Sequence, residues 1–305
     1  MKYINIGGSG IHGSAVTLGC MRIAQMEHND VARLIETAFE AGINMFDHAD
    51  IYGRGQSEQV FAEALKLTSI KREQMILQSK CGIRQGFFDF SKEHILQSVD
   101  QILHRLQTDY LDILLLHRPD ALMEPEEVAE AFQQLQSSGK VRQFGVSNHH
   151  PGQIELLNKS LSVKLVANQL QFSVTNASMI DVGLNVNMEN AEAINRDGQV
   201  LDYCRLQNMT IQAWSPLQYG FFEGIFIGHE KYAALNEVLE RIAAEQQVTV
   251  EAVAVAWILR HPAQMQVVIG TTQQKRVQGM AQASNVQLSR EQWYEIYRAS
   301  GKKLP

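Results

Sequence analysis

The sequence predicts an α/β protein in which residues 1–305 form a single domain, a (β/α)8 TIM barrel with an N-terminal β-hairpin and an extra C-terminal helix. The main observation is that short apolar runs alternate eight times with amphipathic helical segments, as parallel strands alternate with their connecting helices. The length of 305 residues fits one such barrel. Polar residues also follow several apolar runs, and barrel enzymes carry their active sites at the C-terminal ends of their strands. An open, doubly wound sheet is the alternative.

The predicted strands are short apolar runs bounded by glycine or polar residues. They lie near residues 16–20, 43–47, 75–80, 111–117, 141–147, 164–170, 210–215 and 266–270. The predicted helices show apolar residues at spacings of three and four. They lie near residues 28–41, 57–67, 91–107, 125–138, 150–159, 197–207, 231–246 and 273–283, and the extra helix lies near 289–300. The longest irregular stretch, about 173–196, is rich in Asn and is expected to shape the mouth of a site.

A glycine-rich segment near the N-terminus matches the GxGxxG pattern of dinucleotide-binding proteins at Gly8, Gly10 and Gly13. That pattern requires a strand before it and a helix that opens after it. Here the residues that follow look like another strand. We therefore interpret the glycines as a turn between the β-like runs 2–6 and 16–19.

Composition argues against several classes of function. The formal net charge is -6 and there is no Lys/Arg run, which disfavours a nucleic-acid partner. The longest apolar runs, such as residues 111–116, are too short to span a membrane, and the N-terminus lacks the apolar core of a signal peptide. The three cysteines are widely spaced without a CxxC motif, as expected for reduced thiols in a cytoplasmic protein without a zinc site.

Four polar side chains are predicted to gather at one rim of the barrel. Asp47 ends the second strand and Tyr52 follows it, Lys80 ends the third strand, and His117 ends the fourth. An unpaired ammonium at the end of a buried strand is costly, so Lys80 needs a carboxylate, and Asp47 is the candidate. Taken singly, the Asp could cap a turn, the Tyr could pack on the rim, and the His could be a core residue.

Together, the four groups suit carbonyl reduction, in which hydride adds to the carbon and a proton to the oxygen. The pKa of a free Tyr is about 10, and a neighbouring cation lowers it by favouring the phenolate. Lys80 would make Tyr52 a usable proton donor near neutral pH, with Asp47 holding Lys80 in place. A neutral His117 would orient the substrate oxygen.

Over nearly its whole length the sequence resembles the aldo-keto reductase superfamily, in the branch of bacterial oxidoreductases. The family's Asp…Tyr-Gly…Ser-Glu segment, its strand-end lysine and its Leu-His-Arg/Trp-Pro motif correspond to Asp47, residues 52–53, residues 57–58, Lys80 and residues 116–119. The resemblance implies a (β/α)8 barrel, NADPH/NADP+ as the cofactor, and reduction of an aldehyde or ketone to an alcohol. It also implies that Tyr52 is the acid.

The resemblance further assigns cofactor contacts to the strand ends. Ser147, Asn148 and Gln169 correspond to the family's carboxamide-binding residues, and Trp214 to the aromatic residue that stacks on the nicotinamide. The expected cofactor contacts are Met21, Asp47, Ser147, Asn148, Gln169, Trp214, Ser215, Leu217, Gly270, Thr271 and Arg276.

Some positions depart from the family pattern. Residues 279–280 are Gly-Met where the family often has Glu-Asn to hold adenine, and Gly270 stands where some members have a phosphate-binding Lys. A preference for NADPH over NADH therefore rests mainly on Arg276, whose guanidinium suits a phosphate. His48 replaces the usual Thr or Ser; it either fills the rim or adds a titratable group near Lys80.

Aromatic residues in two loops predict an apolar mouth for the substrate. These residues are Phe87, Phe88, Phe90, Tyr219, Phe221 and Phe222, together with Met21 and Trp214. Such walls would favour an apolar or aromatic carbonyl compound over a charged sugar phosphate. The same aromatics could instead be packed within their loops.

Three other functions remain open at this point. A metal-dependent hydrolase would usually show a His-x-His or clustered ligand set, whereas His149 and His150 are adjacent, so no metal is expected. A Schiff-base aldolase could use Lys80 but has no need of the nicotinamide-binding set. An NADPH-binding regulatory subunit of a larger complex would share the fold. The chain itself is expected to be a monomer or a weak oligomer.

Overall fold

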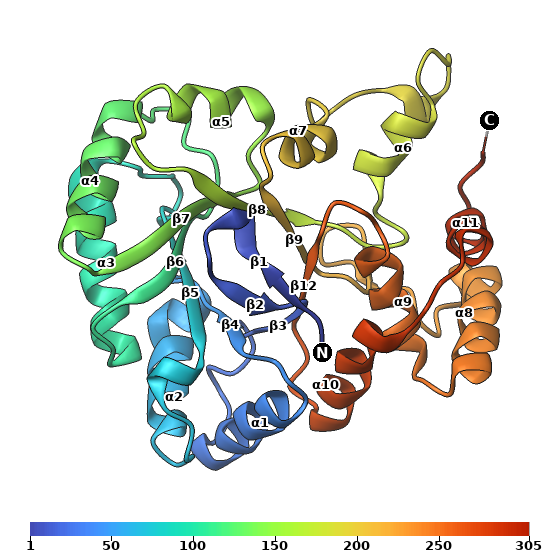
Figure 1. The fold of residues 1–305 in the computed structure, drawn as a ribbon, viewed down its shortest axis with the longest axis horizontal. Coiled ribbons are helices and arrows are strands. Elements are labelled where there is room, and N and C mark those ends of the chain that lie inside the picture. The colour runs from blue at the N-terminus through green and yellow to red at the C-terminus, as the bar shows by residue number, and fades with distance from the viewer. Residues whose placement is uncertain (305) are drawn as a thin grey trace.

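The computed structural model describes residues 1–304 and contains a closed barrel of eight parallel strands (Figure 1). In order around the barrel these are β3 (Val16–Gly19), β4 (Met45–Asp47), β5 (Ile76–Cys81), β6 (Leu111–Leu116), β7 (Val141–Ser147), β8 (Leu165–Gln171), β9 (Thr210–Trp214) and β12 (Gln266–Ile269). β12 closes the barrel by pairing with β3. The predicted fold class is confirmed, and every predicted strand overlaps an observed one.

Helices surround the barrel (Figure 1). They are α1 (His28–Glu40), α2 (Gln56–Leu65), α3 (Lys92–Leu106), α4 (Pro125–Ser137), α5 (Pro151–Asn158), α6 (Ser178–Leu184), α7 (Val200–Leu206), α8 (Ala233–Gln246), α9 (Val250–Leu259), α10 (Gln274–Ala281) and α11 (Arg290–Ala299). In α3 the apolar stripe that includes Ile95, Val99 and Ile102 is buried, and the side chain of Ser91 caps the first turn. Amphipathic periodicity therefore located most of these helices correctly.

Two helices were not expected from the sequence. α9 is buried at every position from 252 to 258, so it has no polar stripe by which periodicity would reveal it. α6 lies within the stretch 173–196 that was expected to be irregular. The predicted helix near 231–246 is α8, which packs on α9 and α11 at the outer edge of the molecule, while α9 is the helix that packs on β12 (Figure 1).

The N-terminal hairpin differs from the expected pairing. β1 (Tyr3–Asn5) pairs antiparallel with β2 (His12–Ser14), whereas the run 16–19 is the first barrel strand. The turn between them docks at the N-terminal ends of β8 and β9, where the Gly7 N–H donates to Thr210 Oγ1 at 2.9 Å. Gly7 has a φ of 55°, and a Cβ there would lie 2.5 Å from Val166 Cα. The GxGxxG segment is therefore a turn at the barrel end opposite the strands' C-termini.

Burial on both faces explains why the barrel strands read as apolar runs. A large core fills the space between strands and helices. A smaller cluster fills the barrel interior below the hairpin, formed by Ile6, Met45, Ile76, Ile113, Leu115, Val166 and Ala167. The interior is thus packed with side chains at this end, and it leaves the C-terminal ends of the strands to carry polar groups.

A short hairpin follows β9 and extends over the C-terminal rim. Its strands, β10 (Gln218–Tyr219) and β11 (Gly224–Ile225), pair antiparallel and present residues 220–223 at the tip. Within residues 1–304, no single helix is long and apolar enough to cross a membrane; residues 230–246 and 250–259 reach that length only as a pair bent by 95°.

Candidate active site

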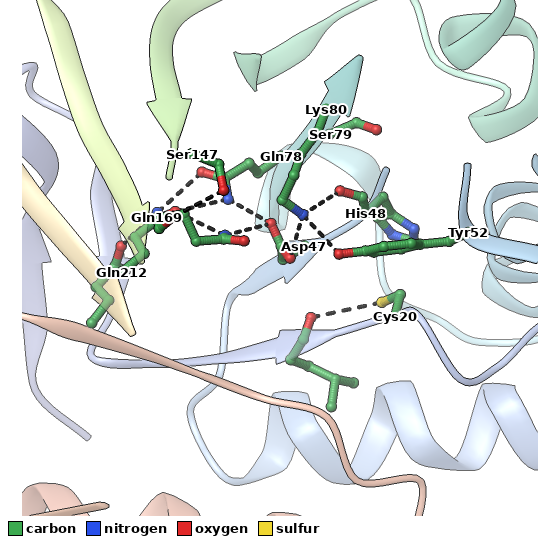
Figure 2. A network of polar contacts seen from close by, with 12 residues as sticks. Cys20, Asp47, His48, Tyr52, Gln78, Ser79, Lys80, Ser147, Gln169 and Gln212 are labelled. Atoms are coloured by element: carbon green, nitrogen blue, oxygen red, sulfur yellow. Dashed lines mark hydrogen bonds and ion pairs between the residues drawn. The ribbon is translucent and has the colours of Figure 1, made fainter. Parts of the chain in front are cut away.

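Lys80, Asp47 and Tyr52 form a hydrogen-bonded group at the C-terminal rim of the barrel (Figure 2). Lys80 Nζ donates to Asp47 Oδ2 at 2.7 Å, to the backbone oxygen of His48 at 2.7 Å, and to the Tyr52 hydroxyl at 3.2 Å. Asp47 and Lys80 meet because β4 and β5 are neighbours in the barrel. Three of the four residues predicted to be catalytic are therefore linked by direct contacts.

The turn that carries Tyr52 depends on Gly53. Tyr52 opens the 3-10 turn η2 (Tyr52–Gly55), and its N–H donates to the backbone oxygen of Ala49 at 3.0 Å. Gly53 has a φ of 57°, and a Cβ at this position would lie 2.5 Å from Ala24 Cβ. This close approach requires a glycine, and the turn brings the Tyr52 hydroxyl within 3.2 Å of Lys80 Nζ.

Burial and charge act in opposite directions on this group. Burial alone would lower the pKa of Lys80, but the attraction to Asp47 and Tyr52 outweighs it and holds this pKa above its ordinary value. Burial raises the pKa of Tyr52 above its ordinary value, and Lys80 opposes the rise without cancelling it. The expectation of a lowered Tyr52 pKa is therefore wrong for this structure. Tyr52 is protonated at neutral pH, which is the form that can donate a proton.

His117 follows β6 and lies beside Tyr52. Its backbone N–H donates to the backbone oxygen of Cys81 at 2.9 Å, and its ring meets the Tyr52 ring edge-on at a centroid distance of 6.0 Å. Burial first, and then the charges of Lys80 and Arg118, lower the pKa of His117 well below its ordinary value. The imidazole is therefore neutral at neutral pH, and its single N–H can donate to a substrate oxygen.

The side chains of Gln78, Gln169 and Gln212 lie beside Asp47 inside the barrel (Figure 2). Gln169 was expected as a cofactor contact, whereas Gln78 and Gln212 were missed by sequence analysis. Gln78 and Gln169 both donate from Nε2 to Asp47 Oδ1, at 2.6 and 3.0 Å. The same two amides donate to Gln212 Oε1, at 2.9 and 3.2 Å. One carboxylate oxygen of Asp47 thus receives the amides, and the other receives Lys80.

The network continues toward the N-terminal end of the barrel. Gln212 Nε2 donates to Gln266 Oε1 at 3.0 Å, and Gln266 Nε2 donates to the backbone oxygen of Ser14 at 2.8 Å. Strand register places Gln212 opposite both Gln169 and Gln266. A signal was present in the sequence: Gln78 lies two residues before Lys80, and residues two apart share one face of a strand.

His48 fills the barrel rim and does not titrate near neutral pH. Its side chain is fully buried, its ring meets Phe61 edge-on at 4.6 Å between centroids, and neither ring nitrogen has a hydrogen-bond partner among residues 1–304. Burial, and then the charge of Lys80, lower the pKa of His48 from 6.5 to about 3. The structure thus favours the rim-filling interpretation of this residue.

We expect His48→Leu to make the protein less sensitive to acid. Between pH 6.5 and 3 the unfolded chain binds a proton at His48 that the native state does not, so this residue makes stability fall as pH falls. The difference in the free energy of unfolding between the variant and the wild type should shift in favour of the variant by up to ~3 kcal/mol when the pH is lowered from 7 to about 4. Urea unfolding at the two pH values measures this. An equal difference at both would contradict the neutral, buried state of His48.

All the residues expected to contact the cofactor line one cavity of about 610 Å³, together with Tyr52 and His117. Lys80 lies beneath the cavity, fully buried. Ser147 Oγ donates to the backbone oxygen of Gln169 at 2.9 Å and accepts from Asn148 Nδ2 at 2.8 Å. The indole N–H of Trp214 donates to Asn148 Oδ1 at 3.2 Å. These hydroxyl and amide groups present both donors and acceptors, as a carboxamide ligand requires.

The far part of the cavity carries Gly270, Thr271 and Arg276 at the start of α10. Arg276 Nε lies 3.6 Å from Glu251 Oε1, which also lines the cavity. This distance is longer than a hydrogen bond, and the Arg276 side chain remains 45% exposed. Arg276 is therefore placed where it can turn toward a phosphate, although Glu251 competes for it.

The aromatic walls agree only in part with the expectation. Met21, Trp214, Phe221 and Phe222 line the cavity. Phe222 stacks near Trp214 at 6.0 Å between ring centroids. The aromatic residues of the loop after β5 do not line the cavity: Phe87 and Phe88 are exposed, and Phe90 is buried against His149. Tyr219 does not line the cavity either, and packs on His229 and Tyr232. The mouth is thus formed by the β10–β11 hairpin.

Two other chemistries find little support. Among residues 1–304 no group of three or more His, Cys, Asp or Glu side chains is arranged to hold a metal ion. A Schiff-base lysine must be unprotonated to attack a carbonyl. The raised pKa of Lys80 and its ion pair with Asp47 keep this amine protonated.

Comparison with known sequences identifies related proteins. The model of the family described as "Aldo/keto reductase family" matches residues 15–300. The uncharacterized oxidoreductase YcsN of Bacillus subtilis is 38% identical, over 96% of this chain and 96% of its own. Oxidoreductase YdhF of Escherichia coli is 35% identical over 98% of both chains. A 6-dehydroglucose reductase of Agrobacterium fabrum is 34% identical over 95% of this chain and 96% of its own.

Solved structures share the fold at lower identity. An aldo-keto reductase from Klebsiella pneumoniae in complex with NADPH superposes with a TM-score of 0.78 at 22% identity, over 97% of this chain and 94% of its own. A thermostable aldo-keto reductase, Tm1743, in complex with the inhibitor epalrestat gives a TM-score of 0.79 at 24% identity, over 98% of this chain and 100% of its own.

Proposed function

Since this chain belongs to the aldo/keto reductase family, as predicted, we propose that it catalyses the NADPH-dependent reduction of an aldehyde or ketone to an alcohol, with Tyr52 as the proton donor. The observation that carries the proposal is that Tyr52 lines the cavity while its hydroxyl lies 3.2 Å from the buried Lys80 ammonium. A protonated phenol beside a fixed cation is suited to deliver a proton to a carbonyl oxygen.

The residues of the chain have distinct parts in this reaction. A reduced nicotinamide, when bound, supplies the hydride that adds to the carbonyl carbon. Tyr52 gives its proton to the carbonyl oxygen, and the neutral His117 donates a hydrogen bond that orients this oxygen. Lys80 stabilises the tyrosinate that remains, and Asp47 holds Lys80 in place. Each group is already positioned before any ligand arrives, which reduces the reorganisation needed in the transition state.

The donors and acceptors of the cavity fit a nicotinamide dinucleotide. Ser147, Asn148 and Gln169 would hold the carboxamide, and Trp214 would contact the ring. Met21, Ser215 and Leu217 would lie along the cofactor, while Gly270, Thr271 and Arg276 would receive the 2′-phosphate of NADPH. The Klebsiella protein of the same fold is seen with NADPH.

We expect Arg276→Ala to weaken the binding of NADPH far more than that of NADH. The guanidinium would lose its charged contact with the 2′-phosphate, which NADH lacks, so the Kd for NADPH should rise about tenfold or more. Nicotinamide fluorescence titrations with both cofactors measure the effect. Arg298→Ala in α11, which lies outside the cavity, is the charge-matched control. An equal loss for both cofactors would contradict a phosphate contact.

The proposed substrate is a small carbonyl compound held beside Tyr52, against the partly aromatic mouth formed by Phe221 and Phe222. The Agrobacterium relative is named a reductase of an oxidised sugar. We further propose that the protein works in the cytoplasm as a monomer or weak oligomer. The three buried free cysteines support a reducing compartment.

Consumption of NADPH against a panel of aldehydes, diketones, quinones and ketones tests the proposed function. We expect oxidation of NADPH in one-to-one proportion to the alcohol formed, with no need for added metal. If NADPH binds and no member of a broad panel is reduced, the regulatory-subunit alternative gains, and protein partners become the next object of search.

A further inference from the structure

Arg118 lies in the cavity next to His117 and has no anionic partner. It lines the cavity and is half-buried. Within the part of the chain that the structure describes, its guanidinium makes no ion pair and no hydrogen bond, whereas Arg105 pairs with Glu58 at 2.7 Å and Arg72 pairs with Asp112 at 2.8 Å. A partly buried cation without a partner is unfavourable, and burial accordingly lowers the pKa of Arg118.

The nearest carboxylate in the sequence is already committed elsewhere. Asp120 Oδ2 accepts the Phe90 N–H at 2.9 Å, and Asp120 Oδ1 accepts the Leu122 N–H at 2.9 Å. Asp120 thus shapes its own loop, and within residues 1–304 it forms no salt bridge with Arg118.

Two aromatic rings lie near the Arg118 guanidinium without using its donors. The guanidinium carbon lies 5.9 Å from the Trp214 ring and 5.8 Å from the Phe221 ring. Contacts at this range are at the outer limit of cation–π attraction, about 6 Å, and leave the guanidinium N–H groups available. The side chain is thus kept at the cavity wall with its planar fork of donors unoccupied.

The charges that line the cavity are also unbalanced. Asp47 is paired with Lys80, and Glu251 faces Arg276. The remaining charged residues on the lining are the cations Arg22 and Arg118, in a chain whose net charge is -6. A concave surface of this kind concentrates anions.

We infer that the carbonyl substrate carries an anionic group, most simply a carboxylate, which Arg118 binds while His117 and Tyr52 receive the carbonyl oxygen. This inference rests on the proposed reductase function and adds a substrate class to it. A bidentate carboxylate supplies the partner that the protein withholds from Arg118. The mouth of the cavity, which the sequence predicts to be aromatic and apolar, is therefore better described as aromatic walls around one cation.

The test compares acids with their neutral esters. Steady-state reduction is measured for 2-, 3- and 4-carboxybenzaldehyde and for the three corresponding methyl formylbenzoates, so that the distance from the carbonyl to the charge is varied. For at least one acid, kcat/KM should exceed that of its ester by about tenfold or more in the wild type. Arg118→Met should remove this preference by raising KM for the acid, so that kcat/KM falls about tenfold more for the acid than for its ester. Arg118→Lys should restore part of it.

A second measurement is independent of turnover. Benzoate binding to the protein loaded with NADP+ is followed by tryptophan fluorescence, to which Trp214 in the cavity contributes, with methyl benzoate as the neutral ligand. Arg118→Met should weaken benzoate binding about tenfold, and Arg33→Met, an equal change of charge on the exposed face of α1, should not. Esters reduced and bound as well as acids would overturn the inference while the reductase function stands. Tight benzoate binding that needs Arg118, without reduction of any aldehyde, would instead overturn the reductase function.

Discussion

Replacement of Tyr52 by Phe is expected to abolish carbonyl reduction while cofactor binding remains close to that of the wild type. The variant keeps the ring that lines the cavity and loses only the hydroxyl that lies 3.2 Å from Lys80 Nζ. Loss of a positioned general acid lowers rates by roughly 10²–10⁴-fold. The rate of NADPH oxidation with the best aldehyde of the panel measures the first effect, and a fluorescence titration with NADPH measures the second.

Tyr219→Phe is a matched control for this experiment. Tyr219 packs on Tyr232 and His229 in the β10–β11 hairpin and does not line the cavity, so the same chemical change there should leave the rate within about twofold. A Tyr52→Phe enzyme that keeps a tenth or more of the wild-type rate would mean that another group delivers the proton. Loss of NADPH binding together with activity would mean that Tyr52 acts mainly in cofactor binding.

The largest effect on stability is expected from Lys80→Met. Lys80 is fully buried and Asp47 is 2% exposed. Removal of the ammonium leaves a buried carboxylate that, among residues 1–304, accepts side-chain hydrogen bonds only from the amides of Gln78 and Gln169. Breaking a buried ion pair in this way costs about 3–5 kcal/mol. Urea unfolding at neutral pH should show this loss in the free energy of unfolding, and reduction should be lost as well because nothing then stabilises the tyrosinate.

A double-variant cycle separates these two effects. Asp47→Asn combined with Lys80→Met removes both charges, and much of the lost stability should return because no unpaired ion remains in the barrel. Activity should not return, since the cation beside Tyr52 is still missing. If the two single losses of stability simply add in the double variant, Asp47 and Lys80 do not form the coupled pair that their 2.7 Å contact indicates.

The barrel and its rim could be predicted because both depend on local patterns. Strands buried on two faces read as apolar runs, and an ionisable residue at or just after the end of a run, such as Lys80 or His117, marks the rim. Parallel strands then bring these residues to one end without further information. Helix α9 was not predicted, because a helix that is buried on all sides has no amphipathic period.

Other features depend on contacts between distant segments, which local patterns do not contain. The pairing of Gln78 with Gln212 joins residues 134 positions apart, and each looks unremarkable in its own strand. The direction of the Tyr52 pKa shift could not be predicted either. Burial raises this pKa and Lys80 lowers it, and which effect is larger depends on how deeply the ring is enclosed. Composition could not show which aromatic residues of the two loops line the cavity. The β10–β11 hairpin places Phe221 and Phe222 there.

The glutamine network also determines where protons can travel. It ends on acceptors on both sides, the Asp47 carboxylate and the backbone oxygen of Ser14, so the orientation of each amide is set along its length. Carboxamides neither gain nor lose a proton near neutral pH, and therefore this network offers Lys80 and Tyr52 no titratable group from the barrel interior. In the proposed reaction, a proton that leaves the Tyr52 hydroxyl is then replaced from the cavity. The mouth proposed to admit the carbonyl compound would thus also be the route by which Tyr52 regains its proton after each turnover.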